Sequence, residues 1–539
     1  MPSPRPARRR IRAGAVAASC ALLLTAATGC GGGSDGARAA HTGRGGTLVV
    51  GATGSLPNPD TILGGAGYEG TALVGFQIYE GLTRYDLSKA DAPAPVAPAL
   101  ATSWQVAEDG KTWTFTLRKG VTFQDGTPFD AAAVVFNLDR YLKKGSPHYT
   151  AALGAAAQEY GSDIASYRTL GDGRVQLVTT TANGHFTDDL THLLIASPAA
   201  VRRYGPDGFR NHPVGTGPFS FVSQAAGQEI DMAANPRYWR GAPKLDRLVV
   251  KALPDPAARS AALLSGGAGL IDYPNPDDLP RLRSAGARIA TNSYDHLWYW
   301  ILDQSTAPWS KPQVRQAANY AIDRKAIAGD LLGGTAGPAY QAAPPGTLAH
   351  DPHGDVYSYD PAKARRLLAE AGYPHGFSTT VTVPTAGSGN LLPVPIAEAV
   401  QRDLAAVGIK AAIRTTDWSS LLSSEAKGQV PLGSQALAQS TTLFQSESLL
   451  PLFLGTGSPF WTGHYSDPAV DGLIKEASAS VDPAVRQRDY RQALDRVTRD
   501  APWLFVVNDR NPRALAPDVH GFVQPQSWFV DLTSVWVGK

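Results

Sequence analysis

The chain has 539 residues, of which 43% are hydrophobic and 18% charged, and its formal net charge is +2. This length suits roughly three or four domain-sized units, and no repeat of fixed period indicates a solenoid or a propeller. Residues 1–29 contain five arginines and no acid, so subtracting these five charges from +2 leaves −3 for residues 30–539. A mildly acidic chain argues against nucleic acid as a partner.

The first 29 residues are predicted to be an export signal. Five arginines between Arg5 and Arg12 precede an apolar stretch over 13–27 that is too short to favour a membrane span. The following Ala27-Thr28-Gly29-Cys30 resembles a lipobox, which predicts acylation of Cys30. The alternative is an ordinary cleavable signal with an incidental cysteine, and both Sec and twin-Arg export stay open. Residues 30–45, rich in glycine and alanine, are predicted to be a flexible tether.

Residues 100–141 have the pattern of a small structural module. Apolar and polar residues alternate over 112–118, which predicts a strand with one buried face. Asp125-Gly126 predicts a sharp turn. Asp130 is expected to cap a helix that begins at Ala131. Nothing in this module indicates catalysis.

This module, LATSWQVAEDGKTWTFTLRKGVTFQDGTPFDAAAVVFNLDRY, resembles a signature of the family 5 solute-binding proteins. This is the peptide-, oligopeptide- and nickel-binding class that serves bacterial ABC importers. Further family-like segments occur in the expected order, namely QIYEGL at 77–82, PVGTGPF at 213–219, NPRYW at 235–239 and PQVRQAANYAIDRKAI at 312–327. The resemblance therefore covers nearly the whole chain that follows the signal.

The resemblance implies an α/β fold of the two-lobed periplasmic-binding-protein type, in its large class with an extra subdomain. The two lobes would face each other across a cleft and be joined by a hinge. The expected boundaries are 46–78, 211–292 and 514–539 for lobe I, 79–210 for the extra subdomain, and 293–513 for lobe II. We expect the chain to cross between the lobes near Ser293–Leu302 and near Asn511–Gly521.

Three Asp-Pro pairs are expected to start helices in the second half of the chain, at Asp360, Asp467 and Asp482. An aspartate can cap a helix N-terminus, and a proline in the first turn has the required backbone angle. The apolar run Trp503–Val507 is predicted to be a buried strand.

No motif in the sequence supports an enzyme, a cofactor or a metal site. Residues 65–70 fit G-x-G-x-x-G, but the preceding strand is expected to end near Gly51, too early for a dinucleotide site. The histidines of His350-Asp351-Pro352-His353 lie in a predicted loop whose spacing matches no common closed site. The cysteines are Cys20, inside the signal, and Cys30, so an exported chain that begins at Cys30 cannot form an internal disulfide.

The charged pair that anchors a dipeptide in the dipeptide-binding members of the family is missing here. Those proteins hold the peptide amine with an Asp and the carboxylate with an Arg. The matching segment 435–444 contains no acid, and the earlier loop 383–395 contains no Arg or Lys. Burying an unpaired ammonium or carboxylate costs several kcal/mol, so this cleft should reject free dipeptides.

What remains is a neutral polar and aromatic lining. It suits a longer peptide held by its backbone, a glycoside or an uncharged natural product. The predicted ligand-binding residues are Leu63, Gly64, Trp300, Gly387, Gly389, Asn390, Trp418, Gln439, Ser440, Thr441 and Trp461.

The sequence thus predicts the substrate-binding lipoprotein of an ABC importer. It would be a monomer attached through Cys30 to the outer face of the cytoplasmic membrane, without a cofactor. It would capture a peptide-like solute between its lobes and deliver it to a membrane permease. The alternatives are a binding protein for an oligosaccharide or uncharged natural product, and a surface sensor or adhesin without transport. An exported enzyme is a third option that lacks a credible catalytic constellation.

Overall fold

The computed structural model describes residues 43–54, 56, 70–347, 349–387, 389–425, 427–441, 450–458 and 463–538. Residues Gly43–Lys539 form one compact unit. The predicted signal and the lipidation of Cys30 lie outside the described residues. The Gly45 N–H donates to the carbonyl oxygen of Lys244 at 2.6 Å, so the end of the predicted tether is already part of the folded unit.

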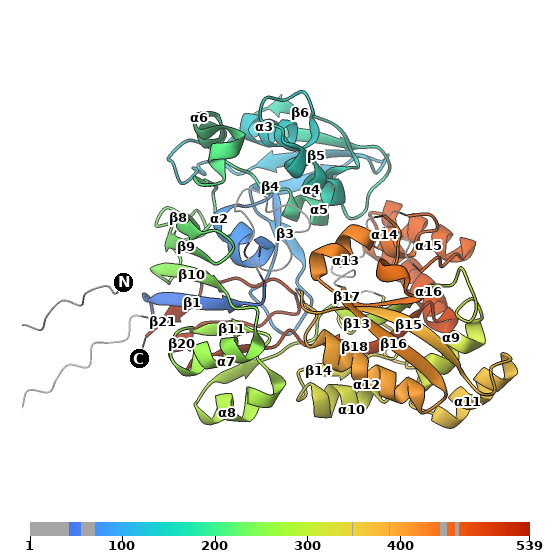
Figure 1. The fold of residues 1–539 in the computed structure, drawn as a ribbon. Helices are drawn as coiled ribbons and strands as arrows, with labels where there is room; N and C mark the ends of the chain where they lie inside the picture. The colour runs from blue at the N-terminus through green and yellow to red at the C-terminus, as the bar shows by residue number, and fades with distance from the viewer. Residues whose placement is uncertain are drawn as a thin grey trace, which may run out of the picture. The chain divides into compact units, whose positions relative to one another are not determined.

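One half of the fold is built around a seven-stranded sheet with the order β12-β19-β11-β1-β10-β9-β8 (Figure 1). Apolar side chains of α7 and α8 pack against β11 and β19. The elements are β1 (Thr47–Ala52), β8 (Phe219–Ala225), β9 (Glu229–Ala234), β10 (Arg247–Ala252), β11 (Leu270–Asp272), β12 (Arg288–Ala290), β19 (Arg513–Leu515), α7 (Pro256–Leu264) and α8 (Leu279–Ser284).

The other half is built around a six-stranded sheet with the order β14-β18-β13-β17-β15-β16. Its strands are β13 (Leu297–Leu302), β14 (Ala336–Pro338), β15 (Phe377–Pro384), β16 (Ile409–Thr416), β17 (Ala436–Thr441) and β18 (Trp503–Asp509). Its helices include α9 (Pro312–Tyr320), α10 (Arg324–Ala326), α11 (Pro361–Glu370), α12 (Pro393–Ala405), α13 (Trp418–Glu425), α14 (Leu450–Leu454), α15 (Pro468–Ala479) and α16 (Pro483–Asp500). All six residues of β13 are buried, which makes this strand the centre of the largest core cluster.

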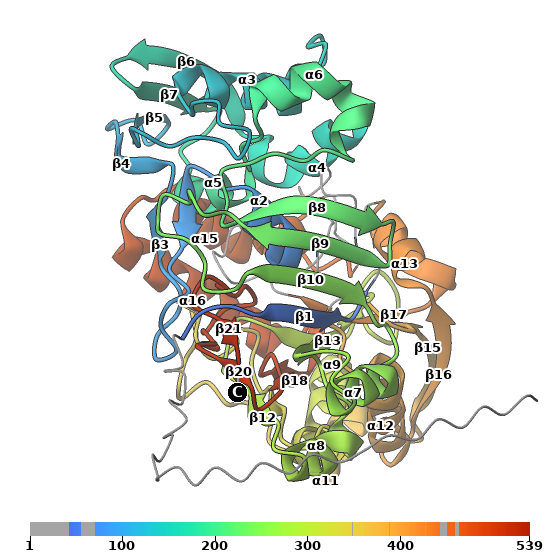
Figure 2. The same ribbon diagram turned by 90° about the vertical axis from the view of Figure 1, so that its left-hand side faces the viewer.

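A four-stranded antiparallel sheet, β4-β5-β7-β6, forms a third group of elements within residues 101–209 (Figure 2). Its elements are β4 (Ala101–Val106), β5 (Thr112–Leu117), β6 (Ile164–Gly171), β7 (Arg174–Thr179), α3 (Ala131–Leu142), α4 (Ala151–Gly161), α5 (Phe186–His192) and α6 (Pro198–Phe209). The predicted strand, turn and cap of the 100–141 module are confirmed. The Asp130 carboxylate accepts from the Ala133 N–H at 2.8 Å.

The three helix starts predicted from Asp-Pro pairs are also confirmed. The carboxylates of Asp360, Asp467 and Asp482 each accept a backbone N–H of the first helical turn at 2.8 Å. The predicted strand at Trp503 is β18, which extends to Asp509.

The chain passes between the two large sheets over residues 291–296 and 510–512. The predicted crossing near Ser293–Leu302 therefore extends too far, because its second half is β13. All six side chains there are buried and pack as a central strand. The second crossing, predicted near Asn511–Gly521, ends at β19 for a similar reason, since all three residues of that strand are buried.

The first crossing is bonded both to the end of β18 and to the second crossing. The Tyr294 hydroxyl donates to Asp509 Oδ2 at 2.9 Å, and the Asn508 side-chain amide donates to the His296 carbonyl oxygen at 3.1 Å. The Asn292 N–H donates to the carbonyl oxygen of Arg510 at 2.9 Å. The connection between the two sheets is therefore a double strand with its own polar contacts.

Across the described ranges, no helix has both the length and the apolar character needed to cross a bilayer. The same residues contain no group of three or more His, Cys, Asp or Glu side chains placed to hold a metal ion.

Candidate functional site

Three of the segments with predicted ligand-binding residues, 387–390, 418 and 439–441, lie at one edge of the six-stranded sheet. β15, β16 and β17 run parallel, so their carboxyl ends lie at the same edge. β13 is antiparallel to β17 and β18, with Leu297 opposite Thr441 and Trp298 opposite Val507. Both crossings thus leave the sheet from this edge. In open α/β sheets, ligands bind just outside the carboxyl ends of the strands.

At this edge the loop after β15 lies directly against the first residue of α13. Gly387 has φ +133°, and a Cβ there would be 2.7 Å from Cδ2 of Trp418 and 3.0 Å from Nδ2 of Asn390. Only glycine fits so close to the indole ring in this backbone conformation. Gly389 also has a positive φ, +76°. The structure therefore brings together four residues that the sequence analysis selected from separate segments.

Gln439 reaches the same region from β17, where it is hydrogen-bonded to an acid that the sequence analysis did not select. Its side-chain amide donates to Glu425 Oε1 at 2.7 Å, and both residues are buried. Burial raises the pKa of Glu425 to about 8, so this carboxyl is mostly protonated at neutral pH. The partner of Gln439 is thus an uncharged group.

Glu425 was missed because it lies outside the two segments in which charged anchors were sought, 383–395 and 435–444. A signal was present in the sequence. Glu425 follows Trp418 by seven residues, which places both on one face of a helix.

The remaining candidate residues are placed differently. Trp300 is 0% exposed in the core, opposite Ala438 of β17 and Leu504 of β18. Ser440 and Thr441 lie at the end of β17. Leu63, Gly64 and Trp461 lie outside the described residues. A ligand-binding role stays a prediction for all the candidate residues.

The seven-stranded sheet presents a matching edge to the crossings. β1, β10 and β11 are parallel and end there, and Asp272 at the end of β11 lies opposite Arg513 at the start of β19. The Arg513 Nε–H donates to Asp272 Oδ1 at 2.8 Å, and both side chains are at most 1% exposed. In the sequence, Leu63 and Gly64 come after β1. Each large sheet therefore meets the crossings with the ends of its parallel strands.

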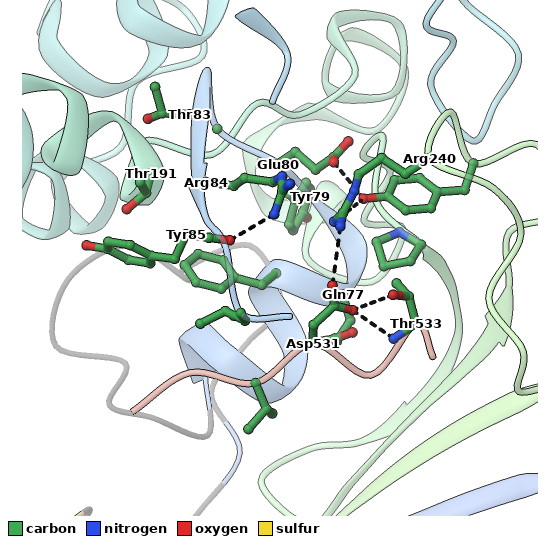
Figure 3. A pocket seen from close by; sticks show the side chains of 16 residues that line it. Gln77, Tyr79, Glu80, Thr83, Arg84, Tyr85, Thr191, Arg240, Asp531 and Thr533 are labelled. Atoms are coloured by element: carbon green, nitrogen blue, oxygen red, sulfur yellow. Dashed lines mark hydrogen bonds and ion pairs between the residues drawn. The ribbon is translucent and has the colours of Figure 1, made fainter. Parts of the chain in front are cut away.

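Two cavities elsewhere do not fit the predicted site. One, of about 60 Å³, is lined by residues that include Gln77, Glu80, Arg84, Arg240 and Asp531 (Figure 3). Its volume is far below the roughly 300 Å³ at which ligand pockets begin. The other, of about 590 Å³, is lined by residues of 322–359 and contains none of the predicted ligand-binding residues.

One residue that lines the small cavity, Glu80, connects three of the family-like segments. The buried carboxylate of Glu80 accepts hydrogen bonds from the Thr216 hydroxyl at 2.8 Å, the Tyr238 hydroxyl at 2.8 Å and the Trp239 indole N–H at 2.7 Å. Burial raises the pKa of Glu80, while these three donors favour its ionised form. The segments at 77–82, 213–219 and 235–239 therefore meet on one carboxylate, and their role here is structural.

The sequence profile described as "Bacterial extracellular solute-binding proteins, family 5 Middle" matches residues 95–459, well over half of the chain. The chain belongs to this family. Heme-binding protein A of Haemophilus influenzae is 30% identical over 487 residues, which cover 87% of each protein. The glutathione-binding protein GsiB of Pectobacterium atrosepticum is 32% identical over 468 residues, covering 84% of this chain and 87% of that protein.

Solved structures agree with this membership. The ABC transporter-associated periplasmic binding protein DppA of Helicobacter pylori, solved with the peptide STSA, is 25% identical. It superposes with a TM-score of 0.77 over 92% of this chain and 99% of that chain. The predicted two-lobed α/β fold and the predicted function, a solute-binding protein of an ABC importer, are thereby confirmed. We use lobe I for the half around the seven-stranded sheet and lobe II for the half around the six-stranded sheet.

Proposed function

We propose that this protein is a lipid-anchored solute-binding subunit that captures an uncharged or backbone-recognised peptide-like solute between the facing edges of its lobes. It would deliver this solute to a membrane permease, act as a monomer and catalyse no reaction. Acylation of Cys30 would hold it at the outer face of the cytoplasmic membrane.

The observation that carries this proposal is the convergence at the lobe II edge. Gly387, Asn390, Trp418 and Gln439 come from three chain segments, and the parallel strands β15, β16 and β17 deliver them to the edge from which both crossings leave. An indole ring packed against a glycine, with the side-chain amides of Asn390 and Gln439 at the same edge, suits a ligand recognised by stacking and hydrogen bonds.

The character of this edge favours an uncharged ligand group. The acid bonded to Gln439 has a pKa of about 8 and is mostly neutral at pH 7. The described residues of 383–395 and 435–441 carry no charged side chain. An oligosaccharide or an uncharged natural product fits the same chemistry and is the second candidate. Peptides, glutathione and heme are named as ligands of the relatives, which makes them natural probes.

A thermal-shift screen of the purified protein tests the proposal. The panel contains dipeptides, longer peptides, glutathione, hemin, oligosaccharides and Ni²⁺ chelates. A ligand present at 100 times its dissociation constant stabilises the folded state by about 2.7 kcal/mol, which raises the melting temperature measurably. We expect longer peptides or sugars to do this and free dipeptides not to.

Two results would contradict the proposal. Stabilisation by free dipeptides would show that charged anchors exist after all. Turnover of any compound in the panel would show that the protein is an enzyme.

A further inference from the structure

Lobe II also contacts the rest of the protein through residues that lie outside both crossings. The Gly184 N–H donates to the Ser478 carbonyl oxygen at 2.7 Å. Nε2 of His185 lies 2.5 Å from the Tyr490 hydroxyl, which is also 2.9 Å from the Ser478 hydroxyl. Gly184 and His185 immediately precede α5, whereas Ser478 and Tyr490 belong to α15 and α16 of lobe II (Figure 2). We call this set the 184–490 contact.

The 184–490 contact is packed as closely as a protein core. Tyr490 is 0% and His185 4% exposed. A Cβ on Gly184 would lie 1.9 Å from the Ser480 carbonyl oxygen, and one on Gly110 would lie 3.9 Å from that of Ala479. A contact of this density, with its polar groups paired, holds surfaces in one arrangement.

The elements before α5 are also fastened to lobe I. The Gln124 side-chain amide donates to the carbonyl oxygens of Ile78, Gly217 and Phe219 at 2.8–3.2 Å. The Gly215 N–H donates back to Gln124 Oε1 at 3.0 Å. The four-stranded sheet is therefore tied to lobe I by the hydrogen bonds of Gln124, and the 184–490 contact joins this part of the protein to lobe II at a point outside the two crossings.

We propose that the 184–490 contact holds the lobes in their ligand-competent arrangement, so that Gly184 and Tyr490 set ligand affinity without touching the ligand. This inference rests on the proposed function, in which the solute binds between the lobes. Rotation at the crossings away from this arrangement must break the contact. The contact then stabilises the closed state relative to the open state. Because the closed state is more populated before binding, the ligand binds with higher apparent affinity.

The first experiment needs no ligand. Gly184→Ala forces a methyl group against Ser480, and Tyr490→Phe removes one hydroxyl while keeping the ring. Gly145→Ala is the matched control, because nothing lies within 4 Å of its new Cβ. Hydrogen exchange at the Gly184 amide and the radius of gyration from small-angle X-ray scattering are measured for each variant. Circular dichroism confirms that each is folded.

We expect both test variants to exchange the Gly184 amide faster and to have a larger radius of gyration than the control. If Gly184→Ala cannot be purified folded, Tyr490→Phe decides alone. A radius of gyration equal to that of the control in both variants would overturn the proposal, because the contact would then not hold the lobes together.

The second experiment measures the dissociation constant of whichever panel compound stabilises the wild-type protein. We expect Gly184→Ala to weaken binding about tenfold, equivalent to about 1.4 kcal/mol. Unchanged or tighter binding would overturn the link to affinity. If no compound of the panel binds, the proposed ligand class fails, whereas the ligand-free measurement still decides whether the contact holds the lobes.

Discussion

At the scale of single residues, the packing around Trp418 shows how an aromatic ring is held at the edge of the lobe II sheet. Its ring is half-buried, packs against the lobe II core and has the Gly387 backbone directly against it. Backbone atoms of Gly387 thus pack directly against the indole, with no side chain between them. A ring fixed in this way loses little conformational entropy when a ligand stacks on it.

We predict that Trp418→Ala weakens ligand binding about 3- to 10-fold, because an aromatic contact is worth roughly 0.5–1.5 kcal/mol beyond its buried area. The measurement is calorimetric titration with a stabilising compound from the thermal-shift panel. Trp104→Ala, which removes a half-buried indole from β4, is the control. An affinity for Trp418→Ala that matches this control would remove Trp418 from the site.

At the scale of elements, Glu80 joins parts of the chain that are far apart in sequence. It follows α2 (Phe76–Ile78), and its three donors come from the loop before β8 and the loop after β9. These loops flank the hairpin that forms one margin of the lobe I sheet. Figure 3 shows the carboxylate among the side chains that line the small cavity.

We expect Glu80→Gln to lower the free energy of unfolding by about 1–3 kcal/mol. The carboxylate accepts from all three groups, whereas the amide of glutamine keeps only one acceptor oxygen and replaces charge-assisted hydrogen bonds by weaker neutral ones. Urea denaturation measures the change. Glu229→Gln is a matched control because Glu229 is 43% exposed and paired only with an exposed lysine. A loss as small as that of the control would mean that the three donors contribute little.

For the whole molecule, buried ionisable groups predict how stability depends on pH. Burial raises the pKa of Asp295 to about 8, of Asp509 to about 7 and of Glu425 to about 8, from ordinary values of 3.8, 3.8 and 4.5. Burial also lowers the pKa values of His185, His192 and His296 to about 3 from 6.5. In the native state, burial thus favours the protonated form of these carboxyls and the neutral form of these histidines.

The two sets act in opposite directions. Between pH 6.5 and 8 the native carboxyls hold protons that the unfolded chain has lost, so stability falls as the pH rises. Below the ordinary carboxyl pKa values, only the histidines still bind different numbers of protons in the native and unfolded states. The unfolded chain binds more protons there, so stability falls as the pH drops towards 3. Between about pH 4.5 and 6.5 the effects of these six groups oppose each other. We therefore expect maximal stability in that window.

Urea midpoints at pH 5.5 and pH 8 test this expectation, and the midpoint should be higher at pH 5.5. Asp295→Asn removes one of the buried carboxyls, so the loss of stability between these two pH values should be smaller in that variant. A wild-type midpoint that is higher at pH 8 would contradict the assignment of neutral buried carboxyls.

The sequence alone determined the family, the fold class and many local structures. Helix caps such as Asp130 and Asp482 and the apolar alternation of β5 depend on interactions within a few residues, so the local pattern is enough to predict them. The candidate residues Gly387, Asn390, Trp418 and Gln439 were selected by resemblance, segment by segment.

Only the tertiary structure decided how these segments are arranged in space and which of their residues touch. The contact of Gly387 with Trp418, the pairing of Gln439 with Glu425 and the convergence of three donors on Glu80 join residues 14 to 159 positions apart. The exact crossings and the 184–490 contact likewise depend on which strands pair and which side chains become buried. Burial also sets the protonation of Glu425, since the same carboxyl in an unfolded chain would be ionised at neutral pH.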